Sequence, residues 1–180
     1  MSFLDLLKRR ESIRNYIDKD VERAKIERCL EAARLSPSAC NSQPWRFIIV
    51  DEPKLKKNIA EATFNNTIPF NNFTLSAPAF VVIVAEDRQL SLKFGGMDKD
   101  IPYYLIDVGI AAEHFCLQAV EEGLGTCMIG WFQEEKIKEA LKVPKEERIA
   151  LVISIGYYEN SGPRKKMRKD MDSIRSYNKY

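Results

Sequence analysis

The sequence has one histidine, four widely spaced cysteines and no long uncharged apolar run. A single His114 leaves few ligands for a zinc site and little capacity for general acid–base catalysis near neutral pH. The cysteines form no C-x-x-C pair, and their spacing suggests neither a metal ribbon nor a disulfide scaffold. No apolar stretch reaches the roughly 18–20 residues that cross a bilayer, and the first residues lack the layout of a secretion signal. We therefore expect a cytoplasmic protein with no metal site and no membrane segment.

Two common nucleotide-binding signatures are also missing. Neither G-x-G-x-x-G nor G-x-x-x-x-G-K-[ST] opens a predicted helix, and Gly123-Leu124-Gly125 precedes a predicted strand instead. No serine, histidine and aspartate set for nucleophilic catalysis is evident. Polar loops without catalytic side chains suit an enzyme whose bound cofactor performs the chemistry. For this reason we assign no catalytic residue.

The composition is that of a globular protein, with 180 residues, 45% hydrophobic and 30% charged. This length fits one domain with a real core. The net charge is only +2, but residues 161–180 carry seven Lys or Arg against two Asp. Such a basic tail favours a phosphate site or a nucleic-acid arm, and a solvated disordered tail is the third interpretation. Its aliphatic and aromatic residues argue against disorder.

Hydrophobic periodicity predicts mixed helices and strands. We expect helices over 2–9, 22–36, 54–63, 102–122 and 134–141, and strands over 45–50, 79–85, 126–132 and 148–157. The strand over 45–50 should be covered on both faces, and 89–100 should form a mobile loop over a pocket. The helix over 102–122 is apolar nearly all round, so part of it should face a second subunit. Three long irregular connections favour a mixed α+β fold over a doubly wound sheet.

One polar loop, Ser36-Pro-Ser-Ala-Cys-Asn-Ser-Gln-Pro-Trp45, stands between a predicted helix and a predicted strand. Its two prolines stiffen the backbone, and its hydroxyl and amide groups can wrap a polar ligand. The alternative interpretation is an ordinary connection rich in turn-forming residues. Within it, Cys40 is either a spacer or a reactive thiol, and no neighbouring base favours the thiol.

A second polar segment follows the first helix. Arg10, Ser12 and Arg14 alternate in an extended stretch, which would place their side chains on one side. Guanidinium groups and a hydroxyl suit a phosphate and a carbonyl-rich ring, although solvent-exposed arginines are the commoner explanation of such a segment taken alone. His114, remote in sequence from both segments, is expected to be a hydrogen-bonded structural histidine.

Four motifs in order resemble those of the nitroreductase family, the FMN-dependent oxidoreductases. The first is Arg10-Glu-Ser-Ile-Arg-Asn-Tyr16, and the second is S-P-S-x-x-N-x-Q-P-W within Ser36–Trp45. The third is Gly123-Leu-Gly-Thr-Cys-Met-Ile-Gly-Trp-Phe132, and the fourth is Gly156-Tyr157 followed by a basic run to Arg168. The resemblance implies an α+β, nitroreductase-like fold: a central, mostly antiparallel sheet flanked by helices in an intertwined homodimer. It also implies one FMN-binding domain over 1–180 whose C-terminal extension, about 160–180, reaches the partner subunit.

The resemblance further assigns the candidate FMN contacts. The phosphate and nearby polar atoms would be held by Arg10, Ser12, Lys166 and Arg168. The ring would meet Arg14 near N1 and the C2 carbonyl, and the backbone of Ile129 and Gly130 near N5. The cofactor would be closed in, from the other subunit, by Pro37, Ser38, Ala39 and Asn41. Asn71 is the candidate asparagine, but Thr74 stands where family members often carry a lysine.

The implied activity passes hydride from NAD(P)H through flavin N5 to a nitroaromatic, a quinone or a similar acceptor. One alternative is a flavoenzyme of the same fold with different chemistry, such as dehalogenation or flavin breakdown. The other is a non-enzymatic module that binds nucleic acid through the basic tail. We expect no nucleic-acid partner, because a flavin phosphate already accounts for the tail's charge. The sequence leaves open whether Lys166 with Arg168, or Arg164 with Lys166, would hold that phosphate.

Overall fold

The computed structural model describes residues 2–86, 101–159, 162 and 164–180. Its α-helices are α1 (Phe3–Arg9), α2 (Arg23–Arg34), α3 (Pro53–Ala62), α4 (Tyr103–Glu121) and α5 (Glu134–Leu141), and two 3-10 helices are η1 (Ala39–Asn41) and η2 (Pro69–Ser76). The strands are β1 (Trp45–Val50), β2 (Ala79–Ala85), β3 (Gly125–Ile129) and β4 (Arg148–Gly156). The predicted loop over 89–100 lies outside the described residues.

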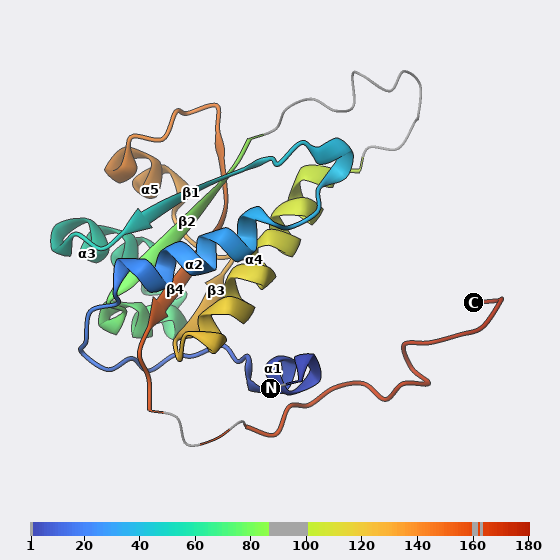
Figure 1. The fold of residues 1–180 in the computed structure, drawn as a ribbon. Helices are drawn as coiled ribbons and strands as arrows, with labels where there is room; N and C mark the ends of the chain where they lie inside the picture. Colours follow the sequence, from blue (N-terminus) through green and yellow to red (C-terminus); the bar gives the residue numbers. More distant parts are fainter. Residues whose placement is uncertain (1, 87–100, 160–161, 163) are drawn as a thin grey trace.

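The four strands form one antiparallel sheet in the order β1-β2-β4-β3. Helices α2 and α4 cover one face and contact alternate residues of β2, including Val81 and Ile83. Helices α3 and α5 cover the other face, where Phe80 and Val82 point. Figure 1 shows the strands between these two layers. This confirms the predicted α+β class, and the full burial of β2 follows from its continuous apolar sequence.

Two strands match the prediction in part. The strand over 45–50 has core contacts on both faces, with Phe47 and Ile49 against one cluster and Ile48 and Val50 in the other, but only Val50 is fully buried. β1 is at the edge of the sheet and has a neighbour on one side only. The strand predicted over 126–132 ends at Ile129.

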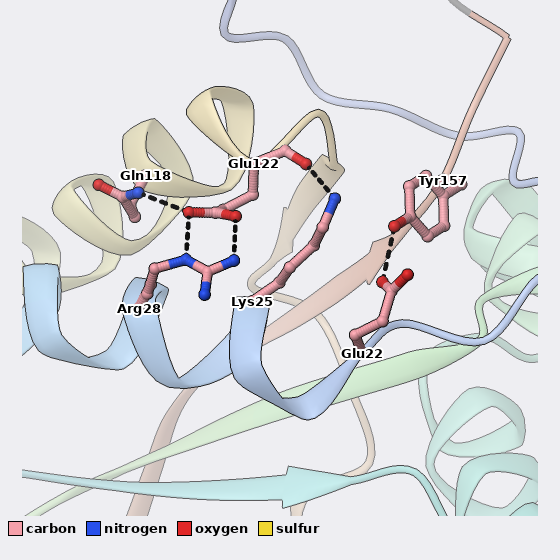
Figure 2. A network of polar contacts seen from close by, with 6 residues as sticks. All are labelled: Glu22, Lys25, Arg28, Gln118, Glu122 and Tyr157. Carbon is pink, nitrogen blue, oxygen red and sulfur yellow. Dashed lines mark hydrogen bonds and ion pairs between the residues drawn. The ribbon is translucent and has the colours of Figure 1, made fainter.

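Polar contacts fix α2 against the end of α4 and the end of β4 (Figure 2). Arg28 donates two hydrogen bonds of 2.7 Å to the Glu122 carboxylate, and Lys25 donates one of 2.6 Å to the Glu122 carbonyl oxygen. The Tyr157 hydroxyl donates to Glu22 at 2.6 Å. Cations at the last carbonyls of a helix complement its dipole. This network therefore holds the point where α4 turns back into β3.

Helix α4 is only partly enclosed by its own chain. Its sheet-facing residues are buried, but Tyr103 and Ile106 are about half exposed, at 49% and 52%. Within the described part of the chain, no helix has the length and apolar content needed to cross a bilayer. The exposed apolar face of α4 is compatible with the expected subunit contact.

The last part of the chain, residues 164–180, has no regular secondary structure and runs past α1 away from the sheet (Figure 1). Large apolar side chains along it are exposed: Met167, Met171, Ile174, Tyr177 and Tyr180. An extended arm with unburied apolar side chains has nothing of its own chain to pack against.

Candidate functional site

The extended segment after α1 is built into the body of the molecule. Ser12 forms a parallel bridge with Thr126 of β3, and the Ile13 N–H donates to the Thr126 carbonyl at 2.9 Å. A Cβ on Gly125 would lie 2.6 Å from the Ile13 side chain, so the close approach requires glycine there. At the end of the segment, the buried Tyr16 hydroxyl lies 2.7 Å from the Ser154 hydroxyl. These contacts hold residues 12–16 against β3 and β4.

Beside this segment lies a pocket of about 260 Å³. Ser12 and Arg14 both line it, but so do the residues between and beside them, and Arg10 does not, so the predicted alternation does not select the lining. Arg10 turns away and forms an ion pair with Glu113 of α4 at 3.3 Å. The remaining lining comes from both ends of the chain: Arg9, Glu11, Ile13, Asn15, Tyr158, Glu159, Gly162 and Arg164.

Cations from the two chain termini gather next to the pocket. Lys166 Nζ donates 2.6 Å hydrogen bonds to the carbonyls of Leu7 and Arg10. Burial lowers the pKa of Lys166, and the positive charges of Arg10 and Arg168 lower it further. Lys166 is therefore close enough to Arg10 and to Arg168 for their charges to oppose its own. An anion bound among them would relieve that repulsion.

Arg164 has a different role from Lys166. Its backbone N–H and its guanidinium both donate to the Glu11 carboxylate, and the guanidinium also donates to the Ser12 carbonyl at 3.1 Å. Burial raises the pKa of Glu11, but the Arg164 hydrogen bonds outweigh burial and hold it below its usual value. The Glu11–Arg164 pair thus fastens the C-terminal segment to the N-terminal one. Sequence reasoning did not identify Glu11 or Glu113, because no local pattern links them to partners more than 100 residues away.

The loop Ser36–Trp45 lies elsewhere, at the first turns of α4 (Figure 1). In the described part of the chain, the pocket lining includes none of its candidate residues: Pro37, Ser38, Ala39 and Asn41. The Ala39 N–H donates to both oxygens of Asp107, at 3.2 and 3.1 Å. The Ser36 hydroxyl lies 2.5 Å from Nδ1 of His114, which gives this histidine a hydrogen-bonded structural contact. Within a single chain, therefore, the two polar segments that the family resemblance assigns to one cofactor lie apart from each other.

The remaining candidate FMN contacts are Ile129 and Gly130, at the end of β3, and Asn71, in η2. Ile129 is buried at the end of β3 beside Val152, and Gly130 directly after it is exposed. Asn71 is buried in η2, and its side-chain amide donates to the Thr63 carbonyl at 3.0 Å. Thr74 is also buried and takes part in the same cluster, with its hydroxyl 2.9 Å from that of Thr63. Asn71 and Thr74 therefore pack η2 onto α3.

All four cysteines are free thiols. Cys29, Cys116 and Cys127 are buried, and burial raises the pKa of Cys29 and Cys116 to about 12. Cys40 is exposed in η1 with a positive φ of 51°. Among the described side chains, no three histidine, cysteine or acidic residues are grouped to hold a metal ion.

Comparison with known proteins identifies the family. The model of the Nitroreductase family matches residues 7–157. The chain belongs to the nitroreductase family. Among solved nitroreductase structures, the FMN-dependent nitroreductase of Clostridium difficile R20291 is 32% identical, with a TM-score of 0.78 over 99% of this chain and 100% of that one. The oxygen-insensitive NADPH nitroreductase of Helicobacter pylori is 26% identical over 97% of this chain and 99% of its own. The iodotyrosine deiodinase of Thermotoga neapolitana is 27% identical over 89% and 90%.

Proposed function

We propose that this nitroreductase-family protein binds FMN and passes hydride from NAD(P)H to a nitroaromatic, a quinone or a similar acceptor. The observation that carries the proposal is the convergence of the two chain ends. Ser12 and Arg14 line one pocket, and Lys166 lies with Arg10 and Arg168 beside it. The names of the Clostridium and Helicobacter relatives support the same cofactor and a pyridine-nucleotide donor.

The residues present fit a flavin nucleotide. Arg10, Lys166 and Arg168 supply positive charge, and among the described residues Arg10 alone of the three forms an ion pair, with Glu113. A phosphate there gains charge-assisted hydrogen bonds from cations and from the Ser12 hydroxyl. Arg164 is already engaged with Glu11, so Lys166 with Arg168 is the pair that we assign to the phosphate.

Arg14 is assigned to the ring. Its side chain is exposed at the pocket and stands 6.0 Å above the Phe73 ring of η2. A fixed cation at the carbonyl edge of the ring stabilises the negative charge that reduction places there. Bound FMN would accept hydride at N5 and deliver it to the second substrate. The backbone of Ile129 and Gly130 would lie near N5, and Asn71 would support the site from η2.

The site is completed by a second copy of the chain. Pro37, Ser38, Ala39 and Asn41 would come from the partner, which explains why they do not line the pocket of their own chain. The unburied apolar side chains of α4 and of the C-terminal arm would then be covered in a homodimer. The chain is accordingly one domain over 1–180 whose extension, about 160–180, embraces the partner.

An absorption spectrum of the purified protein tests the cofactor. We expect flavin bands, either at once or after incubation with FMN and removal of the free cofactor. Steady-state oxidation of NADH and NADPH with nitrofurazone or a benzoquinone then tests the activity. A protein that stays colourless after incubation with FMN would contradict the proposal.

A second candidate is reductive dehalogenation, which the deiodinase relative favours. It requires the same FMN site but a pocket that accepts an iodinated tyrosine. Release of iodide from iodotyrosine by the reduced protein, together with negligible nitroaromatic turnover, would favour this activity over the first.

A further inference from the structure

The loop Ser36–Gln43 has an unusual backbone. Cys40, Asn41 and Gln43 have φ values of 51°, 54° and 49°, although none of them is glycine. Left-handed conformations of this kind cost roughly 1–2 kcal/mol each, least for asparagine. They persist only where other contacts hold them, so the contacts of this loop indicate what sets its shape.

Contacts inside the loop close a tight turn. The Asn41 N–H donates to the Ser38 carbonyl at 3.0 Å, and the Gln43 N–H donates to the Ser38 hydroxyl at 2.9 Å. The Ser42 hydroxyl is buried and has no hydrogen-bond partner, so the turn is not satisfied by its own groups.

Two side chains of α4 hold the loop from outside. Asp107 receives the Ala39 N–H on both carboxylate oxygens, and His114 meets the Ser36 hydroxyl. These two residues are seven positions apart, which places them on one face of α4 about 10 Å apart along its axis. Each contact spans roughly 70 residues of sequence.

Apolar packing alone would not compensate the free-energy cost of burying the Asp107 carboxylate at this position. Asp107 is only 4% exposed, and no described cation lies within ion-pair distance of its carboxylate. A buried carboxylate is unfavourable unless hydrogen bonds compensate it, and here the Ala39 N–H is the described donor.

We propose that Asp107 is a positioning residue that, with His114 as a second anchor, sets the loop in the shape that closes over the cofactor of the partner subunit. The inference rests on the proposed function, because it is Ser38, Ala39 and Asn41 that would contact that cofactor. Asp107 itself touches no cofactor atom. It acts through the Ala39 N–H, which fixes the turn between Ser38 and Asn41.

The test compares Asp107→Ala, which removes the acceptor, with Asp107→Asn, which keeps one. Val108→Ala is the matched control, because Val108 is a neighbouring buried residue of α4 that packs in the core. We expect the FMN dissociation constant, measured by quenching of flavin fluorescence, to rise at least tenfold in Asp107→Ala. It should stay within threefold of wild type in Asp107→Asn and in Val108→Ala, although the latter lowers the melting temperature.

A second readout needs no cofactor. In the flavin-free protein, hydrogen exchange of the Ala39 amide should be at least tenfold faster in Asp107→Ala than in wild type or Val108→Ala. If Asp107→Ala does not fold, Ala39→Pro removes the donor instead, at a position whose preceding residue Ser38 is already extended (φ −144°, ψ 155°). Faster exchange at Asn41 and Ser42 would then support the inference.

The outcomes separate the two proposals. Wild-type FMN affinity and wild-type amide exchange in Asp107→Ala would overturn the positioning role and leave the flavin proposal standing. A wild-type protein that binds no FMN would overturn the flavin proposal and, with it, the closing role assigned to this loop.

Discussion

The two polar segments of this nitroreductase-family chain are held in different ways. Segment 10–16 is bridged to β3, anchored by the buried Tyr16 and fastened to the C-terminal segment through Glu11 and Arg164. Loop 36–43 is strained, and two side chains of α4 hold it from outside. The first segment already gathers cations around a pocket, whereas no lysine or arginine of the described residues forms an ion pair or a hydrogen bond with the second.

This difference suggests a division of labour within each chain. Segment 10–16 provides a rigid charged base, which suits a phosphate that must stay bound. Loop 36–43 provides neutral hydroxyl, amide and backbone groups, which suit contacts to a neutral chain or ring. A complete site needs both, and one chain keeps them on different faces of α4. The proposed homodimer brings them together.

The largest effect on FMN affinity is expected from removing the C-terminal cations that lie near segment 10–16. Replacing both Lys166 and Arg168 by alanine removes two charge-assisted contacts of about 1.5–3 kcal/mol each, so FMN affinity should fall roughly 100-fold or more. The matched control replaces Lys165 and Lys169, which flank this pair in the sequence and carry the same total charge. The control should change affinity by less than about threefold in a fluorescence titration. Equal losses in both variants would show that the tail acts only through its net charge.

A smaller effect is expected at the ring. Arg14→Ala should weaken FMN binding by about tenfold and slow flavin reduction by NAD(P)H, because it removes a cation that favours the reduced ring. Arg14→Lys keeps the charge and should recover most of the reduction rate in stopped-flow measurements. Unchanged binding and reduction in Arg14→Ala would remove its assigned role.

The support of segment 10–16 can be tested without the cofactor. Tyr16→Phe leaves the buried Ser154 hydroxyl without its 2.7 Å partner and should lower the free energy of unfolding by about 1–2 kcal/mol in urea denaturation. Tyr157→Phe removes a hydroxyl bonded to the exposed Glu22 and should cost less than about 1 kcal/mol. A larger loss in Tyr157→Phe would mean that the α2 network, not Tyr16, carries this stability.

The sequence predicts helices and strands better than it predicts the tertiary contacts that hold them and the loops in place. The buried strand 79–85 and the helix 134–141 are confirmed at the predicted residues, because the strand is one continuous apolar run and the helix has Ile137, Ala140 and Leu141 at helical spacing. The edge position of β1 depends on strand order, which local periodicity does not encode. The same limit applies to function. The motifs indicated Ser12 and Arg14 at the pocket, but Asp107 and Glu113 become visible only when α4 is packed against both segments.

The smallest expected effect concerns strain in the loop. Cys40 has a φ of 51°, which glycine adopts freely and other residues adopt at a cost. Cys40→Gly should therefore be more stable than Cys40→Ala by up to about 1 kcal/mol in urea denaturation, since both variants lose the thiol and only one relieves the backbone. The same pair of changes at Cys29, in the middle of α2, should have the opposite order, because glycine weakens a helix interior. If Cys40→Gly is instead the less stable variant, the loop carries no strain for α4 to hold, and the contrast between the two segments would reduce to their charge.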